Sequence, residues 1–146
     1  WVILFRRAMI QISSRIAEKI DAPALISGES VGQVASQTLS NIRATSDAAD
    51  RPILRPLCGM NKEDIINLAQ KIGTYEISIE PYDDCCSFFV PIHPETKANL
   101  DHVIKAESAI DFGDLYDEAM ENTNISTIYN QDYLKKDKKK LEKIYD

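Results

Sequence analysis

The sequence predicts an α/β fold of Rossmann-like type, in which a parallel sheet carries helices on both faces. Apolar residues recur at helical spacing over residues 3–20, 31–48 and 62–72. Between these stretches lie two apolar runs, 22–26 and 52–57, which are too short for helices and suit buried strands. Helices and strands that alternate in this way imply right-handed crossovers between parallel strands. With 146 residues, 44% of them apolar, the chain can bury the core of one domain.

The first predicted helix, Ile3 to Ile20, has one apolar face and several charged positions. Two of these, Arg6 and Arg7, lie near its start, where positive charges oppose the helix dipole. Local electrostatics therefore does not explain them, whereas a partner that carries phosphate would. The alternative is ordinary surface charge, which is the commoner role of arginines on a helix.

The first strand is followed by a segment rich in glycine and small polar residues, Ser27 to Thr38. It stands where the strand turns into the predicted helix 31–48, and such a junction offers free backbone N–H groups to an anion or nucleotide. Ligands of parallel α/β sheets also bind beyond the carboxyl ends of strands. The alternative is purely local: Gly28 permits a tight turn and Glu29 caps the helix. Gln37, two turns into that helix, either reaches a base or ribose or is simply solvated.

The second strand, Pro52 to Leu57, has prolines that exclude a helix across it. We expect Asn61 to cap the next helix, Lys62 to Ile72, and Gly73 to close it in the left-handed conformation. The remaining predicted elements are a brief extended segment at Tyr75–Ile79, a loop after Pro81, a helix from near Pro94, a short helix at Asp114–Glu121 and a lysine-rich solvated tail.

Two adjacent cysteines, Cys85 and Cys86, follow Asp84 in the loop after Pro81. Three interpretations are open: small buried side chains, a metal pair or a nucleophilic thiol. Adjacent cysteines point in different directions and no second cysteine or histidine pair completes a zinc set, so we expect no metal site. A thiolate that carries or attacks sulfur suits a loop better. Cys58 lies in an apolar context and is expected in the core.

Composition limits the partners and the cellular location that we expect for the protein. A net charge of −6 opposes nucleic-acid binding by the whole surface, so such a partner needs a local basic patch or a separate domain. The odd number of cysteines, three, argues against a secreted disulfide framework. No apolar run reaches the roughly 20 residues that span a bilayer, so the expected location is cytoplasmic, away from membranes. The chain begins with Trp1, which indicates that its start has been cut away.

The strongest clue to function is a set of five segments: Phe5–Met9, Ser27–Thr38, Arg55–Glu63, Lys71–Ile79 and Pro81–Cys86. Together they resemble the tRNA 4-thiouridine synthetases, also called tRNA sulfurtransferases or the ThiI family. The resemblance covers the chain up to about residue 100, and the glycine-containing second segment makes it specific.

This resemblance implies the PP-loop fold, similar to the adenine nucleotide α-hydrolases. In that family ATP, with Mg²⁺, adenylates O4 of uridine 8 in tRNA and sulfur then displaces AMP. A link to the sulfur supply of the thiamine thiazole is also implied. The implied partners are tRNA and a cysteine desulfurase as persulfide donor, and a homodimer is a further option. The residues that match the family's functional positions are Arg6, Gly28 and Gln37 on ATP, Glu29 and Ser30 next to the nucleotide, and the catalytic Cys85 on sulfur.

One part of the family pattern is absent. The phosphate-binding Ser-Gly-Gly-x-Asp-Ser loop occurs nowhere in the sequence. We therefore expect residues 1–110 to be the C-terminal part of a PP-loop ATP pyrophosphatase domain, truncated at its N-terminus, and residues 111–146 to form a helical or frayed charged tail. Such a fragment is not expected to hydrolyse ATP alone, and its tRNA-binding regions would precede Trp1. Two alternatives stay open: another PP-loop ATP pyrophosphatase with a small substrate, and a non-catalytic α/β nucleotide-binding module.

The implied chemistry is coherent. Attaching AMP to a carbonyl oxygen creates a leaving group, so a sulfur nucleophile can attack the adjacent carbon. Cys85 either resolves a persulfide donor by forming a disulfide or holds the sulfur itself, and both Cys58 and Cys86 are open as its disulfide partner. The scheme needs Gly28 and Cys85 to line a common pocket.

Overall fold

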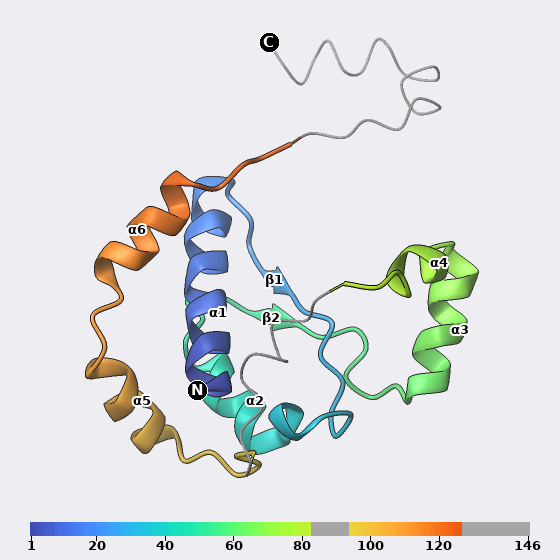
Figure 1. Ribbon diagram of the computed structural model, residues 1–146, viewed down its shortest axis with the longest axis horizontal. Helices are drawn as coiled ribbons and strands as arrows, with labels where there is room; N and C mark the ends of the chain where they lie inside the picture. The colour runs from blue at the N-terminus through green and yellow to red at the C-terminus, as the bar shows by residue number, and fades with distance from the viewer. Residues whose placement is uncertain (83–93, 127–146) are drawn as a thin grey trace.

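The computed structural model describes residues 1–82 and 94–126 of the 146-residue chain (Figure 1). Its helices and strands alternate in the first half, and helices follow in the second. In chain order the elements are α1 (Val2–Lys19), β1 (Leu25–Ile26), the 3₁₀ helix η1 (Ala35–Gln37), α2 (Leu39–Ser46), β2 (Ile53–Leu54), α3 (Lys62–Ile72), α4 (Tyr75–Ser78), α5 (Leu100–Ser108) and α6 (Gly113–Glu121).

The sheet consists of β1 and β2, which run parallel with Leu25 opposite Ile53 and Ile26 opposite Leu54. Between them the chain crosses over through η1 and α2, so the predicted α/β class is confirmed. Both strands are shorter than predicted, although the N–H of Leu25 still donates to the carbonyl of Pro52 and the N–H of Ser27 to that of Leu54. The N–H of Ala22 donates to the carbonyl of Ala17 at the end of α1, and residues after Leu54 enter a turn.

Helix α1 lies at the centre of the molecule, in contact with α2, β1, α5 and α6 (Figure 1). Its predicted amphipathic character is confirmed, since Ile3 and Ala17 are among the buried apolar side chains. Asn41 of α2 is fully buried and links three segments. Its Nδ2 donates to the carbonyl of Ala35 at 3.0 Å and to that of Glu95 at 2.7 Å, while its Oδ1 accepts from the N–H of Ala98 at 3.0 Å.

Arg7 is one of the two arginines for which a phosphate partner was considered, and the structure corrects that interpretation. It is 3% exposed, and its guanidinium donates to Glu107 at 2.7 Å, to Asp47 at 3.2 Å and to the carbonyl of Ala44. Burial alone would lower the pKa of Arg7, but the hydrogen bonds and charges of Glu107 and Asp47 raise it. Arg7 is therefore an internal cation that ties α1 to α2 and α5.

The expected helix 31–48 begins later, at Leu39, where the Thr38 side chain accepts from the N–H of Asn41. A threonine cap satisfies an N–H group that the first helical turn leaves unpaired, so the small polar residues before it form turns and η1 instead. In the same way, the helix expected near Pro94 begins at Leu100, capped by Asn99. The short helix expected at Asp114–Glu121 is confirmed as α6.

Helices α3 and α4 form a hairpin that stands apart from α5 and α6 (Figure 1). The predicted bounds of α3 are confirmed, with a capping box between Asn61 and Asp64 at its start and Gly73 at φ +76° after its end. The extended segment predicted at Tyr75–Ile79 is wrong, since Tyr75–Ser78 is helical. The left-handed glycine reverses the chain, and the N–H of Ser78 then donates to the carbonyl of Thr74 at 3.0 Å.

Within the described residues, no helix combines the length and the apolar character needed to cross a membrane. The cysteine loop after Pro81 and the lysine-rich tail, both named in the sequence analysis, fall in residues 83–93 and 127–146 and lie outside the described residues.

Candidate functional site

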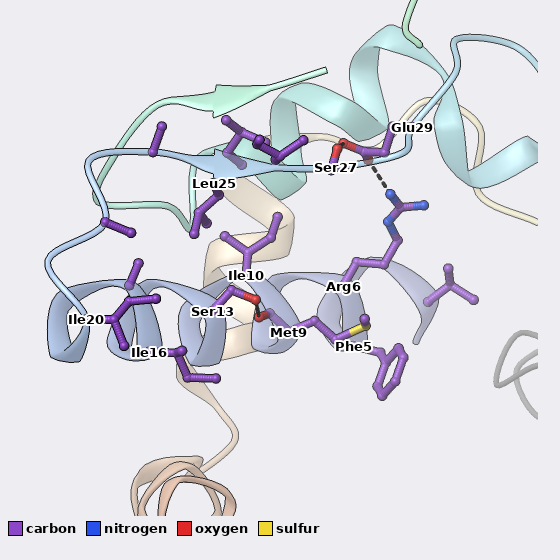
Figure 2. Close-up of a pocket in the computed structure, with 16 residues that line it drawn as sticks. Phe5, Arg6, Met9, Ile10, Ser13, Ile16, Ile20, Leu25, Ser27 and Glu29 are labelled. Atoms are coloured by element: carbon purple, nitrogen blue, oxygen red, sulfur yellow. Dashed lines mark hydrogen bonds and ion pairs between the residues drawn. The ribbon is translucent and has the colours of Figure 1, made fainter. Parts of the chain in front are cut away.

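A cavity of about 560 Å³ lies between α1 and the segment that contains β1 (Figure 2). Apolar side chains from both elements form most of its wall, among them Phe5, Met9 and Leu25. Its polar side chains include Arg6, Ser27 and Glu29, which gather at one end (Figure 2). The cavity therefore combines an apolar body with a charged end, the usual character of a small-molecule site.

Glu29 lies at the centre of the charged end. One carboxylate oxygen pairs with Arg6, and the other accepts from Arg55 Nε at 2.6 Å and from the Ser27 hydroxyl at 2.9 Å. Burial alone would raise the pKa of Glu29, but the hydrogen bonds from Arg55 and Ser27 and the two positive charges lower it below its ordinary value. Glu29 is thus an ionised buried carboxylate, and the helix-capping alternative is wrong because no helix begins beside it.

Sequence reasoning did not assign a role to Arg55, which follows β2 directly. Its Nη2 donates to the Ser46 hydroxyl at 2.6 Å and its Nη1 to the carbonyl of Ile53 at 3.4 Å, besides the bond from Nε to Glu29. The signal that could have found it is its position at the carboxyl end of the strand beside β1, where ligand sites of α/β sheets form.

The loop after β1 is held by bonds within the protein. Gln37 accepts the N–H of Ser30 at its side-chain Oε1 and the N–H of Gly32 at its backbone carbonyl. Val31 donates to the carbonyl of Cys58, and the Ser30 hydroxyl donates to that of Met60 at 2.8 Å. Three of the N–H groups that were expected to be free are therefore engaged. Gly32, at φ +78°, makes the left-handed turn.

Gly28 does not adopt a left-handed conformation, and a Cβ built on it would meet no atom within 4 Å. For the backbone N–H groups of Gly28 and Glu29 no hydrogen-bond partner occurs among residues 1–82 and 94–126. Glu29 lines the charged end of the cavity together with Ser27, and Gly28 stands between them in the chain. The N–H groups of Gly28 and Glu29 are therefore among those of the loop that stay available to an anion.

The structure brings Arg6 and Glu29 together at the cavity end, with Gly28 as the residue just before Glu29. Ser30 and Gln37 close the adjoining loop. Cys58 is half-buried rather than a core residue, and its carbonyl contacts the loop through Val31. Cys85 and Cys86 lie outside the described residues. The common pocket for Gly28 and Cys85 stays a prediction.

In three dimensions the chain is similar to a solved 4-thiouridine synthetase, determined in complex with RNA and with bound ATP. The TM-score is 0.81 and the sequence identity 42%, over 88% of this chain and 33% of that one. The fold is therefore that of the 4-thiouridine synthetase class. A family model described as "Thiamine biosynthesis protein (ThiI)" matches residues 1–112. The chain belongs to the ThiI family, as its sequence motifs predict.

Curated relatives agree with this assignment. A probable tRNA sulfurtransferase from Caldanaerobacter subterraneus subsp. tengcongensis is 53% identical over 110 residues, which are 75% of this chain and 29% of the relative. Another from Clostridium acetobutylicum is 48% identical over 128 residues, 88% of this chain and 33% of the relative. The chain thus spans about a third of the length of the relatives that it matches.

Proposed function

We propose that this chain carries part of the active site of an ATP-dependent tRNA sulfurtransferase that makes 4-thiouridine at position 8 of tRNA. The observation that carries the proposal is the cavity whose charged end joins Arg6 to Glu29, in the loop after β1. The 42% identity to a synthetase solved with bound ATP supports it.

In the proposed reaction ATP supplies the adenylyl group that activates O4 of the uridine, and sulfur then displaces AMP. In this proposal Arg6, which lines the cavity, attracts phosphate charge, and the backbone N–H groups of Gly28 and Glu29 donate to the same anion. Gln37 contacts the nucleotide from the closed loop. Cys85 transfers sulfur, either as the carrier or as the thiolate that resolves the persulfide donor.

The proposal includes Mg²⁺, which would accompany ATP through its phosphates. In the part of the chain that the structure describes, no cluster of three or more His, Cys, Asp or Glu side chains suited to a metal occurs. The proposal extends to tRNA as substrate, a cysteine desulfurase as sulfur donor, homodimer formation, a cytoplasmic location and a link to thiamine. It also holds that residues 1–110 form one part of a PP-loop domain, with 111–146 as a tail, and that the chain is inactive alone.

A hybrid enzyme tests the proposal. In the Caldanaerobacter relative, this chain replaces the segment that it matches, and the hybrid is expressed in bacteria that lack the native enzyme. We expect 4-thiouridine to reappear in tRNA, measured by mass spectrometry of digested nucleosides. A hybrid that folds and still fails to thiolate, while the unaltered relative succeeds, would contradict the proposal.

The role of Cys85 is tested in the same hybrid. The Cys85→Ser variant should lose thiolation yet still adenylate tRNA, because the thiol acts only after AMP has been attached. Adenylation is followed with ATP labelled in its adenine. Thiolation that survives the substitution would show that Cys85 does not transfer the sulfur.

A further inference from the structure

We propose that Glu29 is a positioning residue, whose buried carboxylate holds the Arg6 guanidinium at the cavity end so that it faces the phosphates of ATP. This inference rests on the proposed function, because it takes Arg6 as a contact for the nucleotide. It assigns to the Glu29 side chain an action through Arg6 rather than a contact with the ligand.

The contacts of Glu29 leave it little to offer a ligand. Its side chain is 6% exposed, and both carboxylate oxygens are already engaged, one by Arg6 and the other by Arg55 and Ser27. A carboxylate would also repel phosphate if it faced the ligand directly. Glu29 can therefore lie beside an anion site because its own charge is paired.

The two arginines differ in what remains of their hydrogen-bonding capacity. Arg55 uses all three guanidinium nitrogens on Glu29, Ser46 and Ile53. Arg6 pairs with Glu29 through one nitrogen and makes a long bond of 3.4 Å to the Ser36 hydroxyl through another. Arg6 lines the cavity and is the more exposed of the two, at 21% against 15%. Arg6 is thus the cation with more N–H donors left for a ligand, and the one of the two that lines the cavity.

The charges of the cluster favour an anion. Two guanidinium groups surround one carboxylate, so the cluster keeps one net positive charge at the cavity end. Because Arg55 and Ser27 fix the position of the carboxylate, the carboxylate in turn fixes Arg6. A preoriented cation binds phosphate without losing side-chain freedom at that moment, which improves affinity.

The test uses the hybrid enzyme and measures KM for ATP and kcat of thiolation. Glu29→Gln keeps the shape of the side chain but removes the charge that holds Arg6. The KM for ATP should therefore rise about tenfold, while kcat stays within about threefold of the unaltered hybrid's value. Glu29→Asp, which keeps the charge, should recover part of the loss. Asp50→Asn is the matched control, because it neutralises an exposed carboxylate, the partner of Arg51, outside the cavity. It should leave both constants unchanged.

A double-mutant cycle separates positioning from general stability. Arg6→Ala should raise KM for ATP, and adding Glu29→Gln should raise it little further, because Glu29 acts through Arg6. Additive effects, or an unchanged KM in Glu29→Gln, would overturn the inference. If Arg6→Ala itself leaves KM unchanged, the nucleotide role of Arg6 in the proposed function fails first. Should Glu29→Gln not fold, Ser27→Ala removes one bond to the carboxylate and must show the same non-additivity with Arg6→Ala.

Discussion

At the scale of single residues, buried charge is the feature that constrains this protein most. Arg7 and Glu29 have side chains that are 4% and 6% exposed, and each meets opposite charges at hydrogen-bonding distance. Leaving one such charge without its partner costs several kcal/mol, whereas an exposed pair contributes little. Substitutions at these two positions should therefore affect stability or ligand binding strongly.

The lowered pKa of Glu29 makes the stability of the chain depend on pH. A carboxylate whose pKa in the folded state lies below its ordinary value stabilises the fold above that ordinary value, and this stabilisation is lost as pH falls through the lowered pKa. Between about pH 5 and pH 3 the free energy of unfolding should fall more steeply in the unaltered chain than in Glu29→Gln. Urea unfolding followed by circular dichroism measures both slopes, and equal slopes would refute the prediction.

At the scale of elements, the ends of α3 show how local sequence fixes a helix. Asn61 and Asp64 satisfy each other's backbone N–H groups at the start, and Gly73 takes the left-handed conformation after the end. The capping box and the glycine each involve residues close together in the chain, so they fix the ends of the helix whatever packs against it.

Gly73→Ala tests that local control. An L-residue at φ +76° is strained, so the substitution should lower the free energy of unfolding by about 1 kcal/mol. Gly28→Ala is the control for stability, because its Cβ has open space and no left-handed backbone to oppose. We expect it to change the free energy of unfolding by less than about 0.5 kcal/mol in urea unfolding. Equal losses in the two variants would contradict the argument.

At the scale of the whole molecule, α1 is the element on which the others assemble. Arg7 joins it to α2 and α5, whereas Arg15 joins it to α6 through an ion pair with Asp117 and a cation–π contact at 4.9 Å from the ring of Tyr116. The first link is buried and the second exposed, with Arg15 42% exposed. The two links should therefore contribute unequally to stability.

Arg7→Met should destabilise the chain by about 3 kcal/mol, because it leaves Glu107 and the carbonyl of Ala44 without their shared cation. Arg15→Met, the same change on the same helix, should cost about 1 kcal/mol or less. Thermal and urea unfolding of the two variants give the comparison. Similar losses would mean that the buried cation does not hold α1, α2 and α5 together.

Sequence alone determined the parts of this protein that depend on neighbours along the chain. Periodicity and caps gave α1, α3 and α6, and the apolar runs gave the order and parallel pairing of β1 and β2. The sequence segments around Arg6 and Gly28 identified the ThiI family, and the family-model match confirms it. Apolar periodicity predicted too early a helix start over residues 31–38, because Thr38 caps a later one. The extended segment predicted at Tyr75–Ile79 is wrong, because a further helical turn follows the reversal at Gly73.

Only the tertiary structure decided which charges meet. Glu29 pairs with residues 23 and 26 positions away, and Arg7 with one 100 positions away, so neither pair leaves a trace in local periodicity. Their partners are selected by the crossover and the packing of α1, which also set the burial that makes each pairing necessary. That is why one arginine near the start of α1 became a structural cation and its neighbour remained at the cavity.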